Sequence, residues 1–181
     1  MPTFTEQQII DAAAKVLEAA GTTADNARTV ATLLAEANAT GHDSHGVIRI
    51  PQYLESADKG DVTPNAEIDI VAETPITATV DGNWGFGQVT MNRAVEVGLQ
   101  KAEKSGLSAV AVRGANHIGR LGSYVDHIAQ QGMIGLLFVN AVGTPGYRMA
   151  PWGGTEPRLV TDPVAFGIPH SSGNAIVMDM T

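Results

Sequence analysis

Four side chains with complementary chemistry lie close together near position 45 of this 181-residue chain. Ser44, His45, Arg49 and Tyr53 bring a hydroxyl, an imidazole, a guanidinium and a phenol into one short segment. Arginine can bind a carboxylate through two parallel hydrogen bonds, and histidine can transfer a proton near neutral pH. Such a set suits chemistry at a carbonyl beside a carboxylate, and Arg49 is the expected anchor of that carboxylate.

A second polar cluster contains Asn116, His117 and Arg120, in a glycine-rich loop expected directly after a buried strand over 107–112. Loops at strand ends are common places for ligand binding. His117 is therefore a candidate site residue, although a loop histidine can also be satisfied by backbone carbonyls alone. For the first cluster the alternative is a helix cap with a solvent-facing histidine and arginine.

His42, His45 and His117 could supply three imidazoles, the usual number of protein ligands for a catalytic zinc. His42 and His45 flank an expected helix start, where their geometry for binding one metal ion is poor, and no acidic residue follows in a zinc-protease pattern. We therefore expect no metal. The chain has no cysteine, which excludes disulfides and thiolate nucleophiles.

The segments before residue 62 are expected to be helical. Thr5 and Gln8 could form a capping box for the first of two helices that fill the first forty residues. A third helix is expected to start at Ser44 and to run to about Lys59, bent at Pro51. On that helix His45, Arg49 and Tyr53, spaced i, i+4 and i+8, would share one face.

Beyond residue 62 the pattern changes to short apolar strands that alternate with helices, which indicates a layered sheet-and-helix domain. We expect a helical segment over 1–62 and this second domain over 63–181. Strands are expected at 67–72, 77–81, 107–112, 133–139, 159–168 and 175–180, a tight turn at 82–87 and a helix at 89–104. The sequence stops as an apolar strand is completed, so we expect this domain to continue in a longer protein.

Composition narrows the range of partners. The formal net charge of -8 argues against nucleic acids and anionic membranes, because both favour basic surfaces. The chain shows no signal peptide and no apolar run long enough to span a membrane, so the cytoplasm is the expected compartment. The G-x-G-x-x-G and phosphate-loop motifs are missing, so a dinucleotide would have to bind to a fold other than the Rossmann type.

Five short motifs occur in an order and spacing that together are specific: Ser44-His45-Gly46 with Arg49, Pro51 and Tyr53; Asn116-His117 with Gly119; Pro151-Trp152-Gly153-Gly154; Thr161-Asp162-Pro163; and Asp179-Met180-Thr181. On these residues the chain resembles the malate/L-lactate dehydrogenase family of the non-Rossmann type. That family includes sulfolactate, ureidoglycolate and diketogulonate-type dehydrogenases. Two departures are Asp162, where many members have Asn, and the much greater length of family members.

The resemblance implies an α+β fold with a mixed, antiparallel-rich sheet for the cofactor. It implies an NAD- or NADP-dependent oxidoreductase, usually a homodimer, that interconverts 2-hydroxy and 2-oxo acids. His45 and His117 both match histidines with an acid/base role, and which of them moves the proton stays open. The expected substrate-binding residues are Ser44, Arg49, Tyr53 and Arg120, and the expected cofactor-binding residues are Asn140, Ile176, Val177, Met178, Asp179, Met180 and Thr181. The alternative is a catalytically incomplete fragment that serves in folding, dimerisation or substrate binding.

Overall fold

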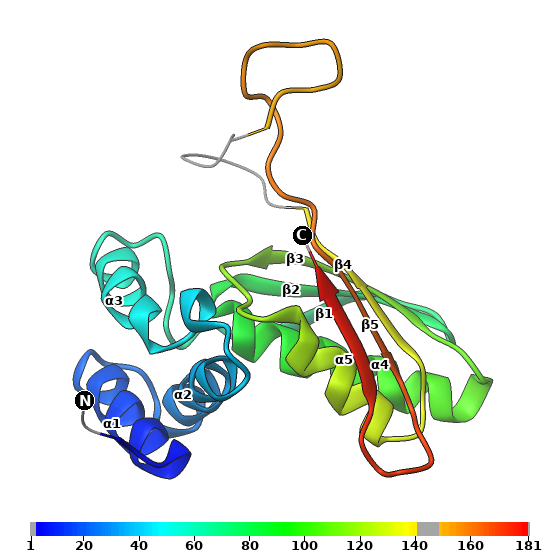
Figure 1. The fold of residues 1–181 in the computed structure, drawn as a ribbon, viewed down its shortest axis with the longest axis horizontal. Helices are drawn as coiled ribbons and strands as arrows, with labels where there is room; N and C mark the ends of the chain where they lie inside the picture. The colour runs from blue at the N-terminus through cyan, green and yellow to red at the C-terminus, as the bar shows by residue number, and fades with distance from the viewer. Residues whose placement is uncertain (1–2, 141–148, 181) are drawn as a thin grey trace. The chain divides into compact units, whose positions relative to one another are not determined.

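The computed structural model describes residues 3–140 and 149–180 of the chain. The fold separates into two compact units, Met1–Arg120 and Leu121–Thr181, which are described one at a time (Figure 1). The boundary expected at residue 62 differs from this division, and that boundary stays a prediction about domain organisation. In the described parts of the chain, every helix is too short or too polar to cross a lipid bilayer.

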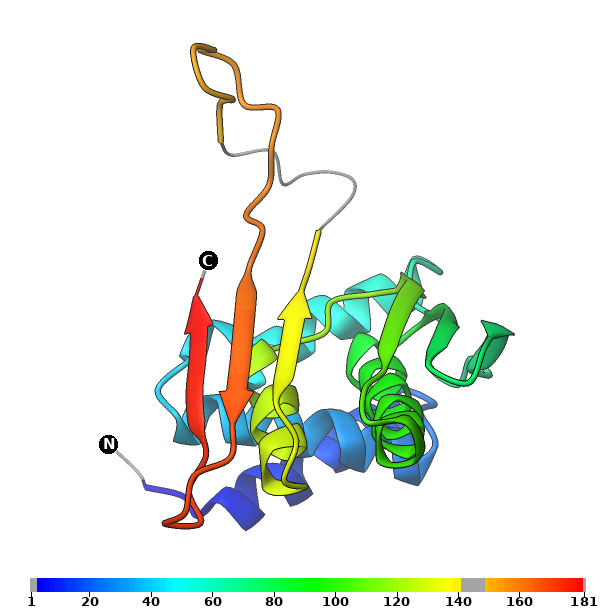
Figure 2. The same cartoon turned by 90° about the vertical axis from the view of Figure 1, so that its right-hand side faces the viewer.

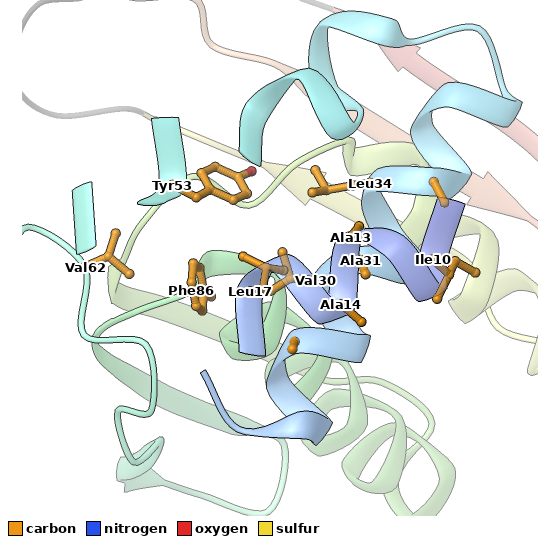
Figure 3. Close-up of a cluster of buried hydrophobic side chains, with 12 residues drawn as sticks. Ile10, Ala13, Ala14, Leu17, Val30, Ala31, Leu34, Tyr53, Val62 and Phe86 are labelled. Atoms are coloured by element: carbon orange, nitrogen blue, oxygen red, sulfur yellow. The ribbon is translucent and has the colours of Figure 1, made fainter. Parts of the chain in front are cut away.

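The first unit begins with two packed helices, α1 (Glu6–Ala19) and α2 (Ala24–Ala39). The capping box expected at Thr5 is confirmed, since its side chain accepts from the Gln8 amide and the Gln8 side chain accepts from the Thr5 amide. Leu17, Val30 and Leu34 are fully buried between the helices (Figure 3). Each such side chain contributes roughly 1.5–3 kcal/mol through burial. Tyr53 packs into the same core, which fixes its ring.

The single helix expected from Ser44 to Lys59 is wrong. Two 3₁₀ turns, η1 (Asp43–His45) and η2 (Val47–Arg49), come first, and the helix α3 spans only Ile50–Asp58. Gly46 is extended between the two turns, with φ -88° and ψ -158°, and this interrupts the helical path. Pro51 lies in the first turn of α3, where its missing N–H breaks no helical bond, so it starts the helix rather than bending it.

A small mixed sheet completes the first unit. β1 (Asp69–Glu73) pairs antiparallel with β2 (Thr77–Gly85), and β2 pairs parallel with β3 (Ala109–Ala115). The helix α4 (Gly87–Ser105) connects β2 to β3 along the chain. The turn expected at 82–87 is in part wrong, because β2 continues to Gly85. The strand is irregular there, since Asn83 and Trp84 adopt left-handed backbone angles with φ of 47° and 59°.

The second unit contains α5 (Leu121–Gln130) and three antiparallel strands in the order of the chain (Figure 2). The strands are β4 (Gly135–Phe138), β5 (Val164–Ile168) and β6 (Ile176–Met180). α5 covers one face of this sheet, where an added Cβ at Gly167 would lie 2.0 Å from the Val125 carbonyl oxygen. The α+β class is confirmed, and three of the four strand pairings described are antiparallel. The strands form two separate sheets rather than one.

The opposite face of the second sheet is apolar and exposed. Strand register places eight large apolar side chains there, of which five are exposed, and Phe138 is 73% exposed. These side chains are Leu136, Phe138, Val164, Phe166, Ile168, Ile176, Met178 and Met180. Val177 and Asp179 lie on the face that α5 covers.

Gly87, the first residue of α4, lies against the loop that carries the second polar cluster. A Cβ added at Gly87 would lie 2.2 Å from the Asn116 carbonyl oxygen and 2.5 Å from that of His117. Both neighbours are backbone atoms, so relief requires the loop itself to move. The close approach of α4 and this loop therefore depends on glycine.

We expect Gly87→Ala to destabilise the protein by roughly 1–3 kcal/mol, because the added methyl group overpacks a backbone contact. Gly98→Ala, in the middle of the same helix, is the matched control, since its Cβ would meet side chains at 3.4 Å and 3.5 Å. That change should stabilise the helix by about 0.5–1 kcal/mol. Urea denaturation followed by circular dichroism measures both. Equal effects of the two substitutions would contradict the interpretation.

Candidate functional site

The segment with Ser44 and His45 is held against α2 by one side chain. Asn38 donates through Nδ2 to Asp43 Oδ1 at 2.6 Å and accepts the Val47 amide through Oδ1 at 2.9 Å. A Cβ at Gly46 would lie 2.2 Å from the Asn38 side chain, so only glycine allows this approach. The glycine of the Ser-His-Gly motif thus has a packing reason, and Asn38 is a supporting residue that sequence reasoning missed.

The loop that carries His117 is held by Asn116. The Asn116 side-chain amide donates to the Trp84 carbonyl at 2.7 Å and to the carbonyls of Asp61 and Gly85 at 3.2 Å each. These three acceptors belong to the end of β2 and to the segment that follows α3. The loop is therefore tied to the same elements that position Tyr53 and its neighbours. In the Asn-His pair of the motif, Asn116 supports the loop and His117 is the candidate site residue.

The structure brings His45, Tyr53 and His117 together. The imidazole rings of His45 and His117 stack with centroids 5.4 Å apart, and the Tyr53 hydroxyl lies 2.7 Å from His117 Nδ1. The two sequence clusters therefore form one site in the first unit. The contact does not depend on the shared helix face that the sequence suggested, because His45 lies in a 3₁₀ turn and Tyr53 in α3.

A hydrogen-bonded chain continues from the site into the core. Gln88 in α4 donates through Nε2 to the Tyr53 hydroxyl at 2.7 Å. Gln88 is 1% exposed and Tyr53 is 4% exposed. Sequence reasoning missed Gln88, although a polar residue three and seven positions before the buried apolar residues Met91 and Val95 is an unusual feature of an amphipathic helix.

Arg49 supplies the positive charge of the site. Its Nε donates to the Ser44 carbonyl at 2.5 Å and its Nη1 to Gln52 Oε1 at 2.8 Å. Its Nη2 has no hydrogen-bond partner among the described residues, which leaves donor capacity for an anion. Ser44 Oγ lies 2.9 Å from His45 Nδ1, so the hydroxyl fixes the ring next to it.

Burial, together with the smaller effects of the nearby charges of Arg49 and His45, lowers the pKa of His117 to about 4. Burial also raises the pKa of Tyr53 to about 12, against the smaller opposing effects of the Gln88 hydrogen bond and the Arg49 charge. At neutral pH the site therefore contains a neutral imidazole and a neutral phenol beside a guanidinium. A neutral imidazole can accept a proton, and a nearby anion would favour that step by offsetting the charge of Arg49.

The remaining expected site residues have other partners or places. Arg120 is largely buried and lies 3.7 Å from the Glu36 carboxylate of α2. Asp179 in the second unit accepts the Gly122 amide at 2.7 Å and so holds the start of α5. Asn140 is exposed after β4, and Thr181 lies outside the described residues. Their roles in substrate or cofactor binding stay predictions. In the part of the chain that the structure describes, no three His, Asp or Glu side chains gather as a metal site.

A family model described as malate/L-lactate dehydrogenase matches residues 4–181, and the chain belongs to this family. The chain is 39% identical over 150 residues to L-sulfolactate dehydrogenase of Methanocaldococcus jannaschii, covering 83% of this chain and 42% of that protein. It is 34% identical over 169 residues to (2R)-3-sulfolactate dehydrogenase (NADP(+)) of Chromohalobacter salexigens, covering 93% of this chain and 49% of that protein.

The solved structure of malate dehydrogenase from Pyrococcus horikoshii has a similar fold, with a TM-score of 0.93 and 31% identity. The match covers 99% of this chain and 50% of that chain. The present chain thus spans about half the length of the relatives that it matches. The family and fold expected from the sequence motifs are confirmed.

The low pKa of His117 predicts that the free energy of unfolding depends on pH. Unfolded histidine titrates near pH 6.5, and the folded value is about 4, so between these values only the unfolded chain takes up the proton. The contribution of His117 to stability is fully present above about pH 6.5 and is lost as the pH falls through 4, by up to about 3 kcal/mol. Urea denaturation at pH 7.5 and pH 4.5 should show this loss in the wild type.

The loss should disappear in His117→Gln, whose side chain does not titrate. His42→Gln is the matched control, because His42 is exposed and its removal should leave the pH dependence as in the wild type. An unchanged pH dependence in His117→Gln would show that the buried imidazole is not its source.

Proposed function

We propose that this chain provides the substrate- and proton-handling site of an NAD- or NADP-dependent dehydrogenase that interconverts a 2-hydroxy acid and a 2-oxo acid. The observation that carries the proposal is the hydrogen bond between Tyr53 and His117 beside the free donor of Arg49. The relatives support it, since their names describe dehydrogenases of sulfolactate and malate. Each of these compounds has a hydroxyl group next to a carboxylate.

Arg49 binds the substrate carboxylate in this proposal. Its Nε and Nη1 are held by Ser44 and Gln52, so the guanidinium is fixed in place before substrate arrives. The side chain needs little reordering on binding, which favours affinity. The carboxylate would also offset a positive charge that lowers the pKa of His117, so substrate binding makes His117 a better proton acceptor.

His117 moves the proton. In oxidation, neutral His117 takes the hydroxyl proton of the substrate while the hydride leaves the same carbon, and in reduction it returns the proton to the carbonyl oxygen. Tyr53 holds the other ring nitrogen and so fixes the ring. His45, stacked on His117 and bonded to Ser44, positions that ring and is the alternative proton carrier.

A nicotinamide cofactor would supply or take up the hydride when bound. The side chains of Ile176, Met178 and Met180 lie on the exposed apolar face of the second sheet, and this surface fits the flat face of an aromatic ring. The proposed binding residues are these three with Asn140, Val177, Asp179 and Thr181. One relative is named as NADP(+)-dependent, and the rates of NADH and NADPH oxidation distinguish the two cofactors.

A second candidate function is favoured by the length of the chain, which is about half that of its relatives. In this case the chain binds a 2-oxo acid through Arg49 and folds or dimerises without turnover. Assembly as a homodimer stays a prediction from the resemblance, and a cytoplasmic location stays a prediction from the sequence.

A charge-removing variant tests the role of Arg49. We expect Arg49→Gln to raise the pKa of His117, because a nearby positive charge is lost, and to weaken binding of 2-oxo acids. NMR of the histidine ring signals against pH measures the first effect, and titration calorimetry with oxaloacetate and sulfopyruvate measures the second. Arg113→Gln is the matched control, since Arg113 pairs with Asp81 at the surface. Equal behaviour of both variants would contradict the assignment.

Oxidation of NADH and NADPH by the chain, with pyruvate, oxaloacetate, 2-oxoglutarate and sulfopyruvate, decides between the two candidate functions. Turnover that falls by roughly 100- to 10,000-fold in His117→Ala supports the dehydrogenase. Calorimetric binding of a 2-oxo acid without turnover supports the binding module. Neither binding nor turnover would overturn both proposals for this chain, and full turnover in His117→Ala would overturn the role of His117.

A further inference from the structure

Gln88 lies at the inner end of the chain of hydrogen bonds that reaches His117. Its Nε2 can only donate, so the Tyr53 oxygen accepts at 2.7 Å. The single hydroxyl proton of Tyr53 is then directed to His117 Nδ1, which lies 2.7 Å away and must be unprotonated to accept it. A neutral imidazole has one ring proton, so this proton is on Nε2 of His117.

The other polar atom of the same side-chain amide is its oxygen, Oε1. Gln88 Oε1 is buried and has no hydrogen-bond partner in the described part of the chain. A half-turn of the amide would bring Oε1 to the Tyr53 hydroxyl. Tyr53 would then donate to Gln88, and His117 would donate to Tyr53 through Nδ1. The two orientations of one side chain therefore correspond to the two ring tautomers of His117.

Only the second arrangement allows His117 to exchange protons with a substrate through Nε2. When Nε2 already carries the only ring proton, it can donate a hydrogen bond but cannot accept the proton of a hydroxyl group. With the proton on Nδ1, Nε2 is a free base. Taking up the hydroxyl proton gives an imidazolium whose Nδ1–H is still accepted by Tyr53, and the Tyr53 proton is accepted by Gln88 Oε1.

We propose that Gln88 is a positioning residue for proton transfer, whose amide orientation selects, through the Tyr53 hydroxyl, which ring nitrogen of His117 carries the proton. In the orientation described, His117 is a hydrogen-bond donor through Nε2. With the amide turned, the proton from the O–H bond of the hydroxy acid can go to Nε2, while the C–H electron pair leaves as hydride to an oxidised nicotinamide when one is bound. The inference rests on the proposed function for its catalytic meaning, but not for its geometry.

Nitrogen-15 NMR tests the inference without any turnover, because long-range proton–nitrogen correlations distinguish the two tautomers of a histidine ring. At pH 7.5 the wild type should show the Nε2–H tautomer at His117. Gln88→Glu, ionised at that pH or at pH 9, can only accept from Tyr53 and should convert His117 to the Nδ1–H form. Gln88→Met, of similar size and with a thioether that is only a weak acceptor, should keep the Nε2–H form.

Adding Tyr53→Phe to Gln88→Glu breaks the chain of hydrogen bonds and should abolish the conversion. An unchanged tautomer in Gln88→Glu, or a conversion that persists without the Tyr53 hydroxyl, would overturn the proposal. If Gln88→Glu does not fold, Gln88→Met at pH 4 decides. In this variant a protonated His117 would donate to Tyr53, but the Tyr53 hydroxyl would have no strong acceptor at position 88. His117 should therefore stay neutral at pH 4, where the wild type is about half protonated. Protonation equal to or above that of the wild type would overturn the role of Gln88.

The test is independent of the proposed function. If the tautomer conversion occurs but the chain binds and converts no 2-oxo acid, the dehydrogenase assignment fails and the link from Gln88 to His117 stands. If turnover depends on His117 but the tautomer does not respond to Gln88, the opposite holds.

Discussion

The hydrogen bond between the Tyr53 hydroxyl and His117 Nδ1 is the interaction on which the site depends. It joins α3 to the loop after β3, two segments far apart in the sequence. It also gives a partner to two polar groups whose burial removes their hydrogen bonds to water. Tyr53 is fixed by the same core that packs α1 against α2. The stability of the helical core and the geometry of the candidate site therefore cannot be changed separately.

Burial also explains why a histidine is useful here. An exposed imidazole is partly protonated near neutral pH, whereas His117 is kept neutral by burial and by the charges of Arg49 and His45. The same surroundings keep Tyr53 protonated. In the proposed reaction, proton transfer would start from neutral groups, and Arg49 is the cation proposed to bind the anionic substrate. The family relationship agrees with this chemistry, since its named members act on malate and sulfolactate.

Local features were predicted well from the sequence, while the meeting of distant residues was not. The capping box at Thr5 and the α+β class follow from neighbouring residues and from periodicity. The prediction of one continuous third helix was wrong because Gly46 is extended where it approaches Asn38. This contact spans eight positions in the sequence, and residue spacing alone does not reveal it. His45 and His117 were both identified as candidates, but their stacking and the part of Gln88 depend on how α3, α4 and the loop pack.

Asp179 links two regions that the sequence presented as separate motifs. Its carboxylate accepts the amide of Gly122, at the start of α5, and Gly122 follows His117 in the chain with only four residues between them. The first amides of a helix have no partner within the helix, and an acidic side chain at this end is favourable. The last strand therefore caps the helix that covers it, and the folding of β6 and of α5 is coupled within the second unit through one hydrogen bond.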